Sequence, residues 1–293
     1  MDGLSSFAAR RVASRGSSTP RDQATKRRLR DLPQTLRESV PAAARAFSDA
    51  SSLTEHITAA CDAVAQLTPE EERAAAPHLV PALAGRLSSS LGRMLRQSAP
   101  DHAGMSSLEA VEAAASFSRA MARMSDHCGG DPAIADAMLS NDTPAVLSAA
   151  LASYSPHYFT TDASSGPTRL LGGDVVMDIS TLSHLCWLVG NISAEPRCAA
   201  AFLDAGGAAA LVRLLRLMHD SRDAASANSD VILQALVALV GLSQQPRGAE
   251  AVTAAGAVAT TVPLLAHTIT PGGGHVGIVV AACRLLRSEE AHV

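Results

Sequence analysis

The stretch LCWLVGNISAEPRCAAAFLDAGGAAALVRLLRL, residues 185–217, predicts three short helices joined by two sharp corners. Its first part carries apolar side chains at helical spacing, namely Leu185, Leu188, Val189 and Ile192. Pro196 suits the first turn of a second helix, and Gly206 can end that helix in a left-handed conformation that a Cβ atom disfavours. Because one such helix cannot bury its apolar side alone, we expect the three to stack on similar units.

The same pattern returns 50 residues later, in ALVALVGLSQQPRGAEAVTAAGAVATTVPLL, residues 235–265. When it is aligned with 185–215 without a gap, 11 of 31 positions are identical, and four of these are alanine. The other seven lie at the corners and on the apolar stripe: Ser193/Ser243, Pro196/Pro246, Arg197/Arg247, Gly206/Gly256, Val212/Val262, Leu214/Leu264 and Leu215/Leu265. An internal repeat of this length predicts an all-α solenoid.

The repeated unit resembles the armadillo repeat. It has a helix ending in W-x-x-x-N (Trp187 and Asn191), a short helix ending at glycine, and a helix with an L-V-x-L-L run. This resemblance implies a right-handed armadillo/HEAT-like α-solenoid of about four units. Three shorter segments, ALASYSPHY at 150–158, the W-L-V-G-N-I-S run and DVILQALVALV at 230–240, are similar to armadillo repeat-containing protein two, a ciliary and flagellar family.

The composition agrees with a helical solenoid. The chain is 47% hydrophobic but only 3% aromatic, so its core must consist of Ala, Leu and Val. Ala and Leu are the best helix formers, and alternating β-branched or aromatic runs are nearly missing. No apolar run approaches the ~18 residues that a membrane helix needs, so we expect no membrane partner.

The charge is unevenly distributed. Residues 1–30 hold eight Arg or Lys and two Asp, net +6, which leaves 16 of the 24 basic and 26 of the 28 acidic residues, net −10, for the remainder. We expect 1–30 to be a disordered basic tail, and an acidic body argues against a nucleic-acid platform. Two alternatives for the tail are a two-part nuclear import signal, Arg10-Arg11 with Lys26-Arg27-Arg28, and an organelle transit peptide. Five scattered cysteines favour a reducing compartment, so we expect a cytoplasmic protein, with the nucleus as an alternative.

The rest of the chain divides into three parts. Residues 31–158 are expected to hold degenerate armadillo-like helices, one of them over 77–97 after a cap at Thr68, and others restarting at Asp131-Pro132 and Thr143-Pro144. Residues 159–176 are expected to form a surface loop, and 177–293 two clear repeats plus a partial third. Because solenoids need a polar end cap and none is evident, we expect either a fragment or end-to-end association.

The resemblance also indicates a binding groove. In the armadillo family the helix bearing W-x-x-x-N lines a concave groove, where the Asn amide bonds the backbone of an extended peptide and the indole packs on its side chains. This implies those roles for Asn191 and Trp187, and His184 precedes them on the same helix face. The alternative is that Trp187 belongs to the core and Asn191 caps a turn.

Equivalent positions extend the groove in both directions. In the next repeat Gln234, Val237 and Gly241 replace the three groove residues, so a single Trp/Asn pair gives a short site. In the preceding helix Arg119 and Arg123 hold matching places and would make one end of the groove positive, but a solvated helix face explains them better.

Catalytic motifs are not supported. The run from Gly272 to Gly277 matches G-x-G-x-x-G, but no strand precedes it and no acid follows at the distance that a dinucleotide site needs. His127-Cys128 lacks partner spacing for zinc, and we expect no catalytic residues, metal or cofactor.

The sequence therefore predicts a non-enzymatic scaffold or adaptor that binds a protein or an extended peptide, with a role in the cilium or flagellum implied by the second likeness. A peptide receptor of the nuclear-transport type is the alternative of the same architecture. An enzyme with a site assembled across helices is the alternative of another class.

Overall fold

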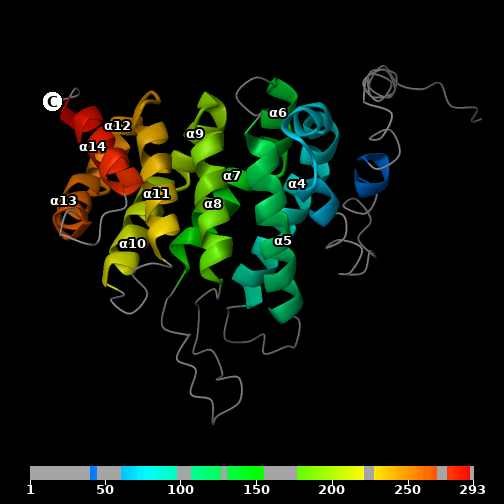
Figure 1. Cartoon of the computed structure of the whole chain (residues 1–293), viewed down its shortest axis with the longest axis horizontal. Helices are drawn as coiled ribbons and strands as arrows, with labels where there is room; N and C mark the ends of the chain where they lie inside the picture. The colour runs from blue at the N-terminus through cyan, green and yellow to red at the C-terminus, as the bar shows by residue number, and fades with distance from the viewer. Residues whose placement is uncertain are drawn as a thin grey trace, which may run out of the picture.

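The computed structural model describes residues 40–44, 61–97, 107–126, 131–154, 177–220, 228–268 and 276–290. In this part of the chain the regular elements are helices, as predicted (Figure 1). The predicted tail over 1–30 and the predicted loop over 159–176 lie outside the described residues.

Within the described ranges the helices form three complete units, each with a first, a second and a third helix. The first unit contains α6 (Pro132–Ser140), α7 (Thr143–Ala152) and α8 (Ile179–Ile192). The second contains α9 (Pro196–Asp204), α10 (Gly207–Asp220) and α11 (Asn228–Ser243), and the third α12 (Gly248–Ala254), α13 (Ala257–Thr268) and α14 (Val276–Glu290). A second and a third helix, α4 (Pro69–Gln97) and α5 (Ser107–Ser125), precede them. In this register, segment 159–176 connects the second and third helices of one unit.

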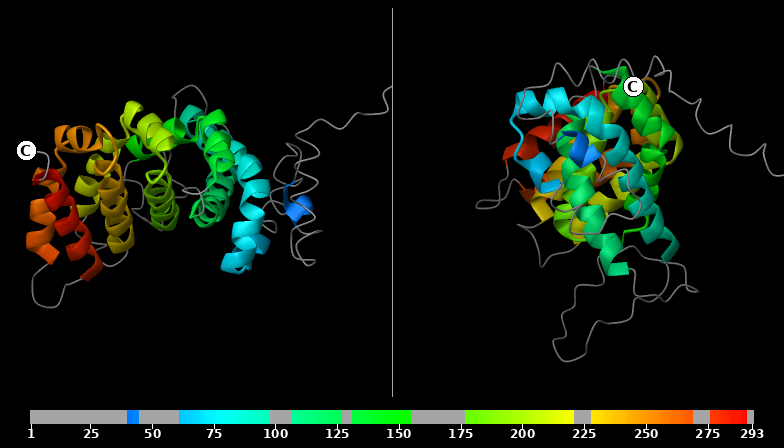
Figure 2. Two further views of the ribbon diagram at one scale, coloured as in Figure 1. Left: turned by 90° about the horizontal axis from the view of Figure 1, so that it is seen from above. Right: turned by 90° about the vertical axis from the view of Figure 1, so that its right-hand side faces the viewer.

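Equivalent helices pack in parallel rows. The third helices contact one another in the order α5, α8, α11 and α14, and the second helices in the order α4, α7, α10 and α13. The stack bends into an arch, and the row of third helices lies on its inner side (Figure 2, left). This is the architecture of an all-α solenoid.

The corners of the repeat form as predicted. Asp131 and Glu195 cap α6 and α9 by accepting from the backbone N–H groups of Ala133 and Cys198, at 2.9 and 2.8 Å. Gly206 and Gly256 follow the first helices with φ of 80° and 83°, so glycine permits these turns where a Cβ atom would strain them.

Two elements differ from the sequence prediction. The predicted cap at Thr68 is confirmed, as a capping box with Glu71, but the helix expected over 77–97 already begins after this cap, at Pro69, and includes Pro77 and Pro81. In the last unit Pro246 does not begin the first helix; α12 starts two residues later, after Arg247, whose φ is 62°.

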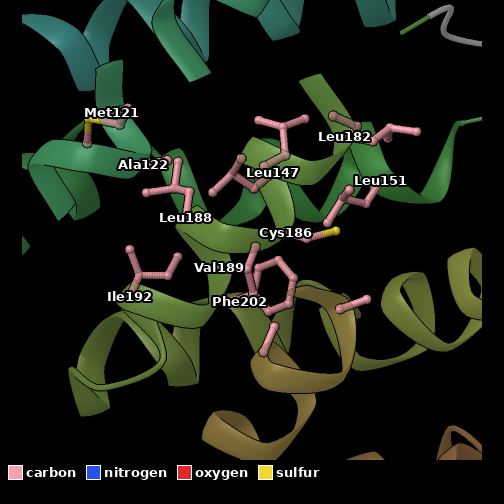
Figure 3. Close-up of a cluster of buried hydrophobic side chains, with 14 of the residues drawn as sticks. Met121, Ala122, Leu147, Leu151, Leu182, Cys186, Leu188, Val189, Ile192 and Phe202 are labelled. Carbon is pink, nitrogen blue, oxygen red and sulfur yellow. The ribbon is translucent and has the colours of Figure 1, made fainter. Parts of the chain in front are cut away.

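The core runs continuously along the stack and consists mainly of Ala, Leu, Val and Met. Figure 3 shows it where Leu147 of α7, Leu188 and Val189 of α8, and Phe202 of α9 meet. Cys186 lies in this cluster, and burial raises the pKa of its thiol to about 12, so it remains a protonated apolar side chain.

Within the described ranges, no single helix is long and apolar enough to cross a membrane. The bent pairs α9–α10 and α12–α13 would satisfy length and composition together, but they turn by 71° and 68° at their glycine corners.

Candidate functional site: the inner face of the third helices

The seven residues predicted to form the groove lie on three helices of the inner row, α5, α8 and α11. Arg119 and Arg123 lie on α5, His184, Trp187 and Asn191 on α8, and Gln234 and Gly241 on α11. These three helices are consecutive in the row. Their individual contacts decide what each can do.

Trp187 is half-buried and packs against the core with part of its side chain. Its ring lies 6.4 Å from that of His184, centroid to centroid, with the ring planes tilted by 32°. Burial lowers the pKa of His184 and the nearby Arg119 guanidinium acts in the same direction, against the Ser180 backbone and Asp178. A neutral imidazole therefore extends the aromatic surface of the indole at neutral pH.

Asn191 joins two repeats. Its side-chain nitrogen donates to the carbonyl oxygen of Ala122 at 2.9 Å, to Ser125 Oγ at 2.8 Å and to Asp126 Oδ1 at 2.6 Å. These acceptors form the C-terminal end of α5, where helix carbonyls lack partners within the helix. The N–H groups that the resemblance assigned to a peptide backbone are thus used within the chain, and binding of a peptide by Asn191 stays a prediction.

Arg123 holds the matching place on α5 and also bonds to the end of a helical stretch that precedes its own helix. Its guanidinium donates to the carbonyl oxygens of Ala65 at 2.6 Å and Leu67 at 3.3 Å, next to the helical stretch 61–65. It also forms an ion pair with Glu72, whose side chain is only 8% exposed. Arg123 is therefore not free to attract a ligand carboxylate.

Arg119 lies one helical turn before Arg123 and is more accessible. It forms an ion pair with Asp62 at 3.2 Å, in which both side chains are largely exposed. Such a pair exchanges readily with water and other partners. The predicted positive end of the face therefore depends on Arg119.

The equivalent positions on α11 have a different chemistry. Gly241 lies so close to the preceding unit that an added Cβ atom would be 2.1 Å from Ser193 Oγ, which explains the absence of a side chain. Val237 replaces Trp187 and is 43% exposed, and Gln234 is half-buried. Gly241 is thus a packing position and contributes no polar group to the face.

An apolar hollow lies between α11 and α14 and was not predicted from the sequence. Its volume is about 250 Å³, and its walls are Leu233, Val237 and Val240 of α11 and Gly277, Val280 and Ala281 of α14, with Arg284 at the rim. The valine at the tryptophan position was the only sequence signal for it. The position of α14, which forms the second wall of the hollow, could not be predicted from the sequence.

Metal chemistry finds no support in the described residues, where no three His, Cys, Asp or Glu side chains converge. The thiols of Cys61 and Cys198 are buried, which raises their pKa values to about 12. Neither is a thiolate nucleophile at neutral pH.

Comparison with known proteins identifies the architecture. No protein-family model and no curated protein matches the sequence. Among solved structures, an engineered protein from a structural genomics programme is similar with a TM-score of 0.54 and 20% identity, over 84% of this chain and 78% of the other. A designed armadillo repeat protein also gives a TM-score of 0.54, with 16% identity, over 86% of this chain and 82% of the other. At this level of identity the likeness concerns the fold, and no match supports the ciliary resemblance. The chain therefore has the fold of an armadillo-repeat solenoid.

Proposed function

We propose that this protein is a non-enzymatic scaffold or adaptor that binds an extended segment of a partner protein along the inner face of α5, α8, α11 and α14. The observation that carries the proposal is Trp187 of α8, a large side chain that packs against the core but is only partly buried. Tryptophan is among the residues that contribute most to binding energy at protein interfaces. The armadillo fold supports the proposal, since solenoids offer an extended concave surface.

A receptor of the nuclear-transport type is less well supported. That function requires a series of Trp and Asn pairs, whereas Val237 and Gly241 replace the pair on α11. On α8 the amide nitrogen of Asn191 is already bonded to the end of α5. The face is therefore better suited to apolar anchoring than to a repeated backbone ladder.

Site-specific photocrosslinking tests the proposed face. A photoreactive amino acid would replace Gln234 on the inner face or, as the matched control, the exposed Ala209 on α10. We expect partner crosslinks from position 234 only, and we expect Trp187→Ala to reduce them about tenfold or more while the helical content is kept. Equal crosslinking from both positions, unaffected by Trp187→Ala, would contradict the proposal.

We further propose a cytoplasmic location with action in a cilium or flagellum. The support is limited to the three short segments that are similar to armadillo repeat-containing protein two. Fluorescent tagging in ciliated cells tests this directly, and a protein excluded from the organelle and its base would contradict it.

End-to-end self-association is proposed for the exposed valines of the last two helices, α13 and α14. Val276 is 75% exposed on this helix, and Val262 on the neighbouring α13 is 51% exposed. Sedimentation equilibrium over a wide concentration range tests the proposal: a monomer throughout would contradict it, and Val276→Glu should abolish any dimer.

A further inference from the structure

The hollow between α11 and α14 is an incomplete part of the inner face. Val237 holds the repeat position that Trp187 holds on α8, and its smaller side chain does not fill the space between its helix and the next. The Cβ atom of an alanine at position 190 would lie 3.8 Å from a Val237 methyl group, so Val237 is directly next to the Trp187 helix. The hollow therefore continues the surface that Trp187 begins.

Its size and lining restrict what can occupy it. At about 250 Å³ it is smaller than the roughly 300–1,000 Å³ of typical small-molecule pockets. The walls are aliphatic, and Val237 and Val280 are 43% and 44% exposed from opposite sides. Exposed apolar side chains gathered in a concavity mark an interaction site. One large apolar side chain of a partner suits this space.

Arg284 adds a charge requirement. It lines the rim of the hollow, one helical turn after Val280, and Arg287 follows three residues later as a second exposed cation. No acidic residue lines the hollow. A guanidinium pairs with a carboxylate through two parallel hydrogen bonds, which gives both attraction and orientation.

We propose that this hollow binds a peptide segment of a partner protein in which one large apolar side chain, tryptophan or leucine, is followed by acidic residues. The apolar side chain enters between Val237 and Val280, and a carboxylate reaches Arg284. This proposal rests on the proposed function of the inner face. It specifies the chemistry of the partner segment that binds the C-terminal half of that face.

Fluorescence polarisation with defined peptides tests the proposal on the full chain. The probe is fluorescein-labelled Ser-Gly-Trp-Glu-Glu-Gly-Ser, with two comparison peptides that carry Ser in place of Trp or Lys in place of both Glu. We expect the probe to bind at least tenfold more tightly than either comparison peptide. If the probe does not bind, or if the three peptides bind equally, the proposal is wrong.

Three variants locate the binding. Val237→Trp fills the hollow with the residue of the preceding repeat, Val280→Glu makes its wall acidic, and each should weaken the probe at least tenfold. Arg284→Glu should weaken the probe and strengthen the Lys peptide, a reversal that a merely unstable variant would not show. Val258→Glu, at an exposed valine of α13 outside the hollow, is the matched control and should leave binding unchanged.

The outcomes separate this proposal from the function of the face. If Trp187→Ala abolishes probe binding but Val280→Glu and Arg284→Glu do not, the inner face binds peptides and the hollow does not. Concentration-dependent dimerisation that Val280→Glu abolishes, without probe binding, would assign the hollow to a second copy of the chain and overturn the proposal.

Discussion

The helices α8 and α11 occupy equivalent places in neighbouring repeats, but they contact the preceding unit by opposite means. On α8, Asn191 reaches across and donates hydrogen bonds to the end of α5. On α11, the same position is Gly241, and the helix comes so close to Ser193 that a side chain has no room. On α5, Arg123 bonds to carbonyl oxygens at the end of the preceding helical stretch 61–65 and forms an ion pair with Glu72 of α4. The same position of the repeat thus makes a packing contact with a preceding segment in each case, but the residue type and the kind of contact differ.

The junction made by Arg123 should be the most costly to break. Arg123→Met keeps most of the aliphatic length but leaves the carboxylate of Glu72, which is 8% exposed, without its partner. Removing one member of a buried ion pair costs about 3 kcal/mol or more. Urea denaturation monitored by circular dichroism measures the loss in the free energy of unfolding.

Arg119→Met is the matched control for this prediction, since its ion pair with Asp62 is exposed. Its cost should remain below about 1 kcal/mol. Equal losses for the two variants would show that burial of Glu72 does not matter. The double variant Glu72→Gln with Arg123→Met should recover part of the loss, because no charge is then left buried.

The close packing at Gly241 should be the next most sensitive feature. Gly241→Ala places a Cβ atom 2.1 Å from Ser193 Oγ, so either the Ser193 hydroxyl must leave its hydrogen bond to the Gly190 carbonyl oxygen or α8 and α11 must move apart, at a cost of about 1–3 kcal/mol. Gly190→Ala is the control on the facing helix, where the nearest atoms would be 3.8 Å away. That change should be neutral or stabilising by up to about 1 kcal/mol, because alanine is the better helix former. Thermal denaturation of both variants compares them directly, and a stable Gly241→Ala would contradict the tight junction.

The hydrogen-bonded junction at Asn191 should follow. Asn191→Ala removes the donor that faces the Ala122 carbonyl oxygen and Ser125, with a loss of about 1–2 kcal/mol. If Asn191 acted only in an open groove, the same change would leave the stability unaltered and weaken partner binding. Denaturation midpoints measured beside peptide affinity distinguish the two roles.

Asn191→Asp sharpens this test because the shape of the side chain is kept. It would place a carboxylate against the Ala122 carbonyl oxygen and the Asp126 carboxylate, which now accept from the amide at 2.9 and 2.6 Å. We expect a larger loss of stability than for Asn191→Ala at neutral pH, and recovery when acid protonates the new group. A smaller loss would show that the amide N–H groups do not hold the junction.

Much of the architecture was predictable because its signals are local. The prolines, glycines and apolar stripe of 185–217 define helices and corners, and Gly206 and Gly256 adopt the positive φ that their positions require. The roles of Asn191 and Arg123 were not predictable, since an Asn or Arg on a helix face has the same sequence signal whether it meets a ligand or the end of another helix. The hollow beside Val237 depends on how closely α14 approaches α11, and this distance cannot be predicted from the spacing of residues in the sequence.

The smallest expected effect concerns His184, which has a neutral counterpart in Gln234 on α11. Burial lowers the pKa of His184 in the folded chain below its ordinary value of 6.5, with Arg119 acting in the same direction. The unfolded chain therefore takes up a proton more readily as the pH falls through 6.5, so the stability contributed by the neutral imidazole is present above this pH and decreases below it. His184→Gln should remove this part of the pH dependence, because glutamine does not titrate. The free energy of unfolding is measured for both proteins between pH 8 and 5. In the difference between the two values, the contributions of the carboxylates and other histidines that both proteins share cancel. If the difference in the free energy of unfolding stays constant over this range, the environment of His184 beside Trp187 does not shift its pKa, and the prediction is wrong.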